Sequence, residues 1–558
     1  MNYSDLQNGK YRNPILFADY SDPDVIRVGD TYYMTASSFN YTPGLPILIS
    51  KDLVNWELKN YAVKNIGYDR YRIPRHSEGV WAPAIRYHDG MFYIYYGMPD
   101  EGFFVVRTKD PLGEWEEPVC ILEGKGLIDS CPFWDDDGRA YVIHGYAKSR
   151  IGFKSILGIF EMSPDGLKAV SEDHFIFNGN DPQHPAVTIE GPKVYKRNGY
   201  YYIWAPAGGV REGYQVVLKS GNIHGPYEIR KVMHQGDTVI NGPHQGALVD
   251  TVNGDEWFVH FQDRGLYGRI CHLQPVSWQG DFPVIGTNPD DNGCGEPVYE
   301  MHKPDTGLIC DDPLYLEGSD DFRGGEISLI WQWMGNHDKL FWGKRDEGDG
   351  VRLFCLNPSG EREPVIWKSA NVLTQKLIYP QFEALVRADF SGLKRGERAG
   401  ICMTGGQYTA AFLENGDDGL LIKTIESEGG DFDKSERTLK SLDLGDLCKD
   451  HGISAEYALK NIVFRMLFTY DEKAAPENEL YFQNVSYRAE GKGPTLKIGI
   501  GFETGGDITF TDLGIAFTPS DHTWVGAKLG IFALGTDNTK DPGYADFISV
   551  HVREIDES

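Results

Sequence analysis

The most regular feature of the sequence is a hydrophobic pattern that occurs five times in the first half of the chain. In each copy a two-residue polar turn precedes a strand rich in aromatic and β-branched residues; the strands read TYYMTAS, MFYIYYG, RAYVIHG, YYYIWAP and DEWFVHF. Four of the turns are Asp-Gly or Asn-Gly, which favour β-hairpins because a type I′ turn needs positive φ at both central residues. The turns begin at positions 29, 89, 137, 198 and 253, and each interval has room for one four-stranded antiparallel sheet. Five such units in series predict a five-bladed β-propeller over residues 1–300.

The pattern changes after residue 300. Residues 301–319 contain Asp, Gly and Pro without periodicity, which is typical of a linker. Beyond them, apolar and polar residues alternate along strands that no hairpin repeat connects, at 327–333, 351–356, 382–390 and 457–470. We therefore expect a second domain over residues 320–558, an antiparallel β-sandwich, with helix limited to short pieces such as 444–451. The predicted fold class is all-β.

The repeat also places candidate chemistry at one position. Blades of a propeller meet at a central axis, so equivalent positions on their inner strands face one cavity. Where each inner strand begins, the five copies have Asp22, Trp81, Asp129, Glu190 and His244. A single Asp there is typically a turn cap, but three carboxylates at five equivalent positions indicate a shared site. Like charges in a partly desolvated cavity push the pKa values of the carboxyl groups apart, so that one can act as a general acid and another as a general base. An acid, a base and an aromatic wall are the groups that a glycosidase needs.

Composition and charge narrow the partners. The chain of 558 residues has 54 Lys and Arg against 82 Asp and Glu, a net charge of −28 and an isoelectric point near 4.9. Such an acidic chain repels phosphate backbones and anionic lipids, so we expect neither nucleic acid nor a membrane as a partner. No secretory signal is visible in residues 1–17, and no apolar run approaches the length of a membrane span. The eight cysteines show no zinc-ligand spacing, so we expect free thiols and a cytoplasmic location.

The motifs around the candidate positions resemble one family of enzymes. They are Asn13-Pro14-Ile15-Leu16 before Asp22-Pro23, Phe39 in SSFNYTPG, Trp81-Ala82-Pro83, Asp129-Ser130, Glu190-Gly191-Pro192, His244 in HQGALVD, and Gly268-Arg269. Each motif is weak alone, but together and in blade order they resemble glycoside hydrolase family 43. The resemblance covers the whole propeller. The region 320–558 is similar to the concanavalin-like, C-terminal β-sandwich of that family's β-xylosidases.

The resemblance implies a role for each carboxylate. Asp22 matches the general base, which activates a water molecule on the face opposite the leaving group, and Glu190 matches the general acid, which protonates the glycosidic oxygen. Asp129 matches a third carboxylate that keeps the pKa of the acid raised and orients it. Asp24 lies two residues beyond Asp22, but the Asp-Pro step at position 22 favours Asp22 as the base.

The resemblance also implies binding residues. Phe39 and Trp81 would form an apolar wall on which a sugar ring stacks, with ordinary core packing as the alternative. Arg269 matches a substrate-binding arginine, and Arg264 is a rival for this role. His244 matches an axial histidine that supports a calcium ion in many relatives; a simple hydrogen-bond partner of the carboxylates is the alternative.

The expected activity is that of an inverting, exo-acting glycoside hydrolase that releases terminal pentose from oligosaccharides. A β-D-xylosidase with secondary α-L-arabinofuranosidase activity is expected first; a dedicated α-L-arabinofuranosidase, an endo-acting arabinanase and a non-catalytic carbohydrate-binding propeller are the alternatives. Retention of three carboxylates disfavours the non-catalytic propeller. The sandwich is either a polymer-binding module or a lid on the pocket, and the alternation of Trp331, Trp333 and Trp342 with apolar residues favours the lid. The oligomeric state is left open, a homo-oligomer included.

Overall fold

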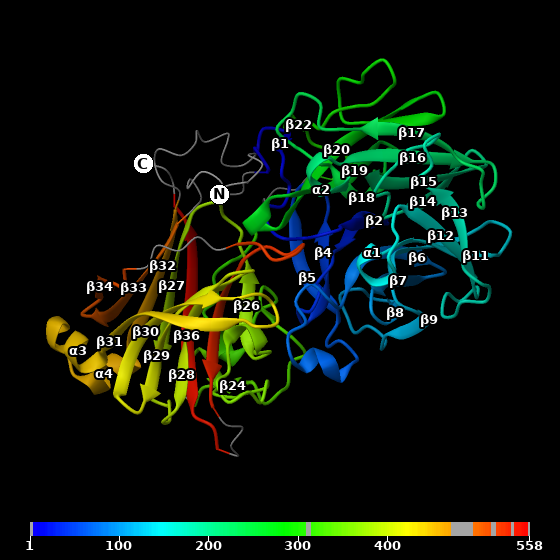
Figure 1. Cartoon of the computed structure of the whole chain (residues 1–558). Coiled ribbons are helices and arrows are strands. Elements are labelled where there is room, and N and C mark those ends of the chain that lie inside the picture. Colours follow the sequence, from blue (N-terminus) through cyan, green and yellow to red (C-terminus); the bar gives the residue numbers. More distant parts are fainter. Residues whose placement is uncertain are drawn as a thin grey trace.

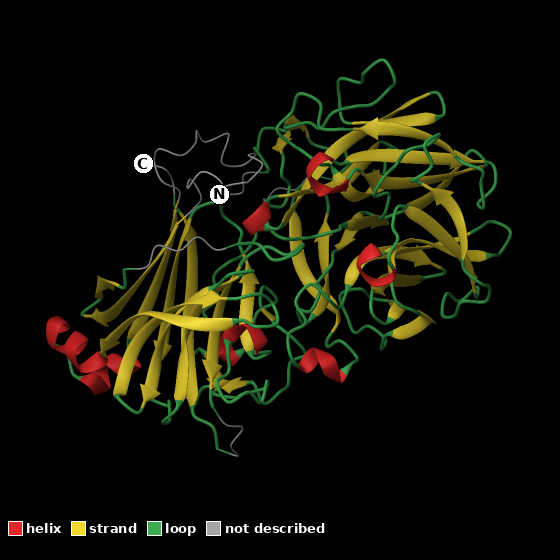
Figure 2. Ribbon diagram, in the orientation of Figure 1, coloured by secondary structure: helices red, strands yellow, loops and turns green. Residues whose placement is uncertain are grey.

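The chain folds into two β-rich parts that lie side by side (Figure 1). A computed structural model describes residues 4–308, 314–346, 348–469, 495–514, 520–536 and 541–555. Strands dominate both parts, and the helices are short (Figure 2). The α-helices are α1 (Lys148–Ile151), α2 (Gly209–Glu212), α3 (Leu444–His451) and α4 (Ala455–Lys460), and the 3₁₀ turns are η1 (Asp69–Arg72), η2 (Gly265–Tyr267), η3 (Arg323–Gly325) and η4 (Ile366–Lys368).

The first part is a five-bladed β-propeller, as the hairpin repeat predicts. Each blade is a four-stranded antiparallel sheet whose strands follow one another in chain order. At Asp89–Gly90 and Asn198–Gly199 both turn residues have positive φ, which is the conformation that the type I′ turn requires. The blades are β2 (Asp24–Val28), β3 (Thr31–Thr35), β4 (Gly44–Ser50), β5 (Trp56–Val63); β6 (Trp81–His88), β7 (Met91–Met98), β8 (Gly102–Thr108), β9 (Val119–Glu123); β10 (Leu127–Trp134), β11 (Ala140–Tyr146), β12 (Ile156–Met162), β13 (His174–Asn178); β14 (Lys193–Arg197), β15 (Tyr200–Ala207), β16 (Tyr214–Ser220), β17 (Glu228–Met233); and β18 (His244–Asp250), β19 (Glu256–Asp263), β20 (Arg269–Gln279), β21 (Phe282–Ile285).

The second part is a sandwich of two seven-stranded antiparallel sheets, with a core of apolar side chains between them. One sheet has the order β23 (Gln332–Trp333), β26 (Val372–Lys376), β35 (Lys528–Leu534), β28 (Glu397–Thr404), β29 (Thr409–Gly416), β30 (Gly419–Glu428), β31 (Ser435–Asp443). The other has the order β24 (Trp342–Lys344), β25 (Val351–Phe354), β36 (Tyr544–Glu554), β27 (Phe382–Asp389), β32 (Ile462–Thr469), β33 (Thr495–Thr504), β34 (Asp507–Asp512). The all-β prediction is therefore confirmed for both parts.

Two strand predictions in the sandwich were wrong in detail. Of residues 327–333 only 332 and 333 form a strand, β23. The segment 457–470 divides into the end of α4 and the strand β32, and residue 470 lies outside the described residues. Helix α4 forms because Ser454 caps it, its side chain accepting a hydrogen bond from the backbone N–H of Tyr457. The short helix expected at 444–451 is α3.

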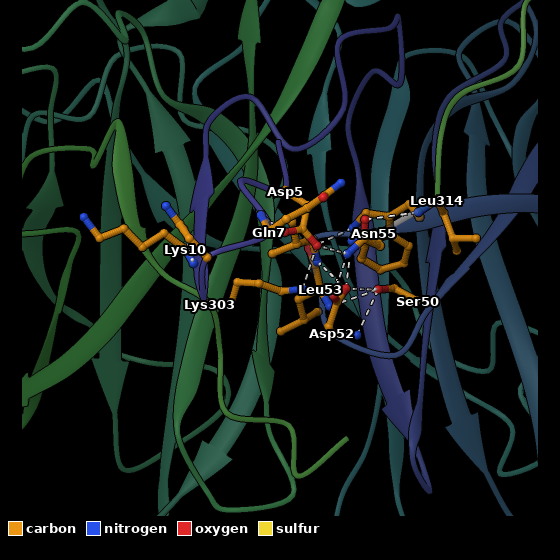
Figure 3. Close-up of polar contacts among 12 residues, drawn as sticks. Asp5, Gln7, Lys10, Ser50, Asp52, Leu53, Asn55, Lys303 and Leu314 are labelled. Carbon is orange, nitrogen blue, oxygen red and sulfur yellow. Dashed lines mark hydrogen bonds and ion pairs between the residues drawn. The ribbon is translucent and has the colours of Figure 1, made fainter. Parts of the chain in front are cut away.

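Chain segments far apart in sequence tie the N-terminus to the end of the propeller. Strand β1 (Lys10–Arg12) pairs with β22 (Glu300–His302) in a separate two-stranded sheet. Beside it, the Lys303 ammonium lies 2.8 Å from Asp5 Oδ2 and 2.6 Å from Asp52 Oδ2, and Asn55 Nδ2 donates to both carboxylates (Figure 3). Burial alone would raise the pKa of Asp5, but the hydrogen bonds from Lys303 and Asn55 leave it below its usual value. Lys303 therefore compensates two buried negative charges.

The propeller and the sandwich share a continuous apolar interface. Phe39, Trp81 and Ile128 of the propeller belong to the same buried cluster as Met334 and Phe532 of the sandwich. Backbone contacts reinforce it, since Thr42 and Trp333 form an antiparallel bridge. The two parts are thus joined through buried side chains and through the backbone.

The aromatic residues that could have marked a polymer-binding face lie in the sandwich core instead. Trp331 and Trp333 are 2% and 4% exposed, and Trp342 packs on the same cluster. Their positions favour the structural interpretation of the sandwich over the binding-module interpretation.

Replacing Lys303 by Met should destabilise the propeller, because Asp5 and Asp52 would lose the ammonium that pairs with both of them. We expect a loss of about 2 kcal/mol in the free energy of unfolding, measured as a drop in Tm by calorimetry. Lys10→Met is the matched control, because Lys10 makes an exposed ion pair with Glu300 and should cost less than about 0.5 kcal/mol. Equal effects of the two substitutions would contradict this interpretation.

Candidate active site

The inner strands share an unusual backbone feature at one end of the propeller. Asp22, Ala82, Asp129 and Gln245 have positive φ angles of 56°, 36°, 62° and 22°, and Gly191 takes φ 56° in the fourth blade. Non-glycine residues rarely adopt positive φ, and those that do cluster at functional sites. The pairing of β6, β10 and β18 with the next strand is irregular at the same places. Such irregularities re-aim side chains, and here they accompany the start of the cavity.

A cavity of about 310 Å³ lies at this end and is lined by residues from all five blades. The three predicted catalytic residues and the three predicted substrate-binding residues all line it: Asp22, Phe39, Trp81, Asp129, Glu190 and Arg269. They come from the loop before β2, the loop between β3 and β4, strands β6 and β10, the loop before β14, and the start of β20. The structure therefore brings together six side chains that are up to 247 residues apart in sequence.

Asp22 is held by hydroxyl groups and by one guanidinium. Its Oδ2 accepts hydrogen bonds from Ser21 Oγ at 2.8 Å and from Ser37 Oγ at 2.6 Å, and its Oδ1 lies 3.0 Å from Arg269 Nη1. Ser37 Oγ in turn accepts from the backbone N–H of Ala82. These contacts compensate the charge of a nearly buried carboxylate and fix its orientation, as a general base requires.

Asp129 and Glu190 form an electrostatically coupled pair. Burial and the charge of Asp22 raise the pKa of Asp129 to about 6, although the Gly191 N–H donates to its Oδ2 at 2.8 Å. Burial and the charge of Asp129 raise the pKa of Glu190 to about 8, against the opposing effect of Arg269. Glu190 therefore keeps its proton at neutral pH beside a carboxylate that accepts hydrogen bonds, which is the condition for a general acid and a general base in one cavity.

His244 lies behind Glu190 and is not among the residues that line the cavity. Its Nε2 is 3.4 Å from Glu190 Oε1, and burial together with the Arg269 charge lowers its pKa to about 3, so the ring is neutral. Calcium takes six to eight oxygen ligands, whereas the imidazole offers one nitrogen. Among the described residues no group of three or more His, Cys, Asp or Glu side chains could hold a metal ion. The side chains around His244 thus do not fit a calcium site built by the protein, and no catalytic step is assigned to a metal.

Two rival candidates lie away from the cavity. Asp24 is fully buried, and its Oδ2 pairs with Arg86 Nη1 at 2.7 Å, while Arg86 Nη2 donates to Cys131 Sγ. Arg264, the alternative to Arg269, is also buried and does not line the cavity. The geometry therefore favours Asp22 over Asp24 and Arg269 over Arg264.

Aromatic rings form one wall of the cavity, and the sandwich supplies one of them. The Phe39 and Trp81 rings lie 6.5 Å apart, and Trp524, from the loop before β35, packs edge-on against Trp81 at 4.7 Å. Arg150 lies over the Trp81 ring at 5.3 Å. The sandwich thus closes one side of the cavity, as the lid interpretation predicted.

Sequence reasoning missed Trp524 and Gln245. Gln245 follows His244 in the chain and takes the left-handed position in the fifth blade, so that it lines the cavity and its side chain lowers the pKa of Asp129. In the fifth blade, the residue after the predicted position His244 would have been the correct choice. Trp524 belongs to a domain without the blade repeat, and nothing in the sequence connects it to the propeller.

A five-bladed propeller whose central cavity gathers three carboxylates, one held protonated, and an appended β-sandwich define a glycoside hydrolase. The chain belongs to glycosyl hydrolases family 43, whose family model matches residues 11–283. A second model, described as the β-xylosidase C-terminal concanavalin A-like domain, matches residues 319–553.

Similar proteins span both domains. A putative β-xylosidase from Xylanibacter ruminicola is 39% identical over 428 residues, which cover 75% of each chain. A β-xylosidase from Formosa agariphila is 31% identical and covers 98% of this chain and 90% of its own. A solved structure of a bifunctional GH43-CE protein from Bacteroides eggerthii superposes with a TM-score of 0.77 at 26% identity, over 98% of this chain and 64% of that one.

Replacing Glu190 by Gln should remove the proton donor and leave the shape of the cavity. We expect kcat on a natural oligosaccharide to fall by roughly 10²- to 10⁴-fold. An aryl glycoside with a good leaving group needs little protonation and should lose much less. Rates on both substrates, with Tm as the check on folding, measure the difference. Equal losses on the two substrates would contradict the role of general acid.

The pH dependence should report the Glu190 proton. Because a general acid must be protonated, activity should fall as pH rises through about 8, the pKa to which burial and Asp129 raise Glu190. Asp129→Asn removes a neighbouring negative charge, so the alkaline limb of kcat/KM should move to lower pH. An alkaline limb that stays in place in this variant would contradict the coupling of the two carboxyl groups.

Proposed function

We propose that this glycoside hydrolase is an inverting, exo-acting β-D-xylosidase that removes terminal xylose from short xylo-oligosaccharides. One observation carries the proposal: the three carboxylates and the aromatic wall share one small cavity, which the sandwich closes on one side. Its volume of about 310 Å³ is at the lower end of the range of roughly 300–1,000 Å³ for ligand sites. Such a cavity suits the end of a sugar chain, whereas an endo-acting enzyme needs a cleft open on both sides.

The proposed chemistry gives one role to each of two carboxyl groups in the cavity. Glu190 donates its proton to the glycosidic oxygen as the bond from that oxygen to the anomeric carbon breaks. Asp22 takes a proton from a water molecule, whose oxygen forms the new bond to the anomeric carbon on the opposite face. The sugar product therefore has the inverted configuration. Each cycle leaves Glu190 ionised and Asp22 protonated, and proton exchange with water restores both groups.

The remaining residues prepare the site for this exchange. Arg269 and the hydroxyl groups of Ser21 and Ser37 orient Asp22. Asp129 keeps the proton on Glu190 by charge repulsion. Phe39 and Trp81 offer apolar surface to one face of the sugar ring, which has no charge to conflict with the acidic protein.

Other expectations stay predictions. A cytoplasmic location is supported by the free cysteines of the described chain, which suit a reducing compartment. The described part of the chain has no helix long and apolar enough to cross a membrane. A homo-oligomer and a calcium ion at the propeller axis stay predictions, although the described side chains around His244 fit calcium poorly.

Substrate preference is tested by comparing an aryl β-D-xylopyranoside with an aryl α-L-arabinofuranoside. We expect kcat/KM to be at least about tenfold higher on the xyloside, which is about 1.4 kcal/mol of preference in the transition state. Addition of a chelator should leave both rates unchanged, because the described side chains around His244 do not build a calcium site. A preference for the arabinofuranoside would mean that the enzyme removes arabinose side chains. Loss of activity with the chelator would show that a metal ion supports catalysis.

A further inference from the structure

The tip of the loop that carries Trp524 is a strained turn. His522 and Val525 exchange two backbone hydrogen bonds of 2.9 Å, so Thr523 and Trp524 are the central residues of a tight turn. Trp524 has a φ of 66°, a conformation that favours glycine or asparagine at this position and is rare for a bulky side chain. Such a conformation persists only where the surrounding structure imposes it. The contacts on both sides of the turn therefore decide where the Trp524 ring lies.

The C-terminal side of the turn is fixed to the propeller by hydrogen bonds from two backbone N–H groups. The backbone N–H of Gly526 donates to Asp19 Oδ2 at 3.1 Å, and the backbone N–H of Ala527 donates to the carbonyl of Leu266 at 2.7 Å. Asp19 also accepts from the backbone N–H of Arg269, which belongs to the catalytic cavity. This side of the loop is thus held without any contribution from His522.

The N-terminal side is held through the imidazole of His522. Its Nδ1 lies 2.7 Å from Ser77 Oγ of the propeller, and its Nε2 lies 3.0 Å from Asp431 Oδ2 of the sandwich. Ser77 Oγ also donates to the carbonyl of Thr523 at 2.6 Å. Ser77 has one hydroxyl proton, so it can donate to Thr523 and accept from His522 but cannot donate to both. When Ser77 donates to Thr523, Nδ1 of His522 is therefore the donor to Ser77 Oγ, and Nε2 faces the Asp431 carboxylate.

The neighbours of His522 include one carboxylate in direct contact. The groups that face it are Asp431, with Lys434 beyond it on the same loop, and His76 of the propeller, whose ring centroid is 5.7 Å away. Burial lowers the pKa of His76 to about 3, so it is neutral, and its Nε2 donates to the carbonyl of Trp367. Among the described residues, the direct charged contact of His522 is the carboxylate of Asp431.

The set of Ser77, His522 and Asp431 resembles a nucleophilic triad in composition, but its geometry indicates another role. The Ser77 proton is already donated to Thr523, and the Ser77 side chain is buried and does not line the cavity. A nucleophile needs a base that takes its proton and access to the substrate. The three residues instead connect the propeller to the sandwich at the turn beside the cavity.

We propose that His522 is a positioning residue for substrate binding: held between Ser77 and Asp431, its imidazole fixes the turn that places Trp524 in the cavity wall. The proposal rests on the proposed function, since it concerns the same cavity. Trp524 packs on Trp81, which belongs to the apolar wall and not to the acid–base pair. Its contacts are therefore the same in the ground state and the transition state, and their loss should change KM and leave kcat nearly constant.

The test is the steady-state kinetics of His522→Asn on an aryl glycoside that the wild type cleaves. KM should rise roughly threefold to tenfold, the factor that aromatic contact energies correspond to, while kcat changes less than about twofold. His551→Asn is the matched control, because His551 makes an exposed ion pair with Asp321 elsewhere on the sandwich; it should leave KM and kcat unchanged.

A second variant keeps the test decisive if His522→Asn folds poorly. Ser77→Ala removes only one hydroxyl group and should raise KM by a similar factor. A wild-type KM in either folded variant, or a fall in kcat with KM unchanged, would overturn the proposal. The wild-type preference between xyloside and arabinofuranoside decides the proposed function separately, because the ratio of variant to wild-type KM is measured on whichever glycoside the enzyme cleaves.

Discussion

Mutual repulsion among three carboxyl groups in one desolvated cavity is the constraint on which the rest of this structure depends. Burial raises the pKa values of Asp129 and Glu190, and each negative charge makes the ionisation of its neighbours more costly. The cavity can hold all three only if one keeps its proton and another is compensated by a cation. Glu190 keeps the proton, and Arg269 compensates Asp22. The separation of acid from base thus follows from burial and from the placement of a single guanidinium.

The propeller meets this constraint through its backbone, and the sandwich completes the enclosure. Residues with left-handed backbone conformation at the start of the inner strands are strained. The ring of five four-stranded blades supplies the packing that holds them. The sandwich adds a ring from Trp524 and shares a buried apolar cluster with the cavity wall. Domain docking is therefore part of the site, because without it the carboxylates would face water and the aromatic wall would lose one member.

The blade repeat is the reason that much of the fold and the site could be predicted from sequence. Propeller symmetry gives equivalent residues equivalent positions, so Asp22, Asp129 and Glu190 could be placed together before their contacts were known. The same logic failed by one residue at Gln245, because the irregular pairing of β18 with β19 shifts the register there. Trp524 and His522 could not be found, since their positions depend on how two unrelated domains dock. In the sandwich, the alternating hydrophobicity of 457–470 predicts a strand over the last residues of α4, where the Ser454 cap starts a helix instead.

Inversion at the anomeric carbon is the direct consequence of assigning Glu190 as the acid and Asp22 as the base for water. The measurement that tests this division most directly is time-resolved proton NMR of the sugar released from an aryl β-D-xylopyranoside, before mutarotation mixes the anomers. The assignment predicts that α-xylose appears first and β-xylose follows only by mutarotation. Initial release of β-xylose would mean that a carboxylate attacks the sugar directly, and it would contradict the roles given to Asp22 and Glu190.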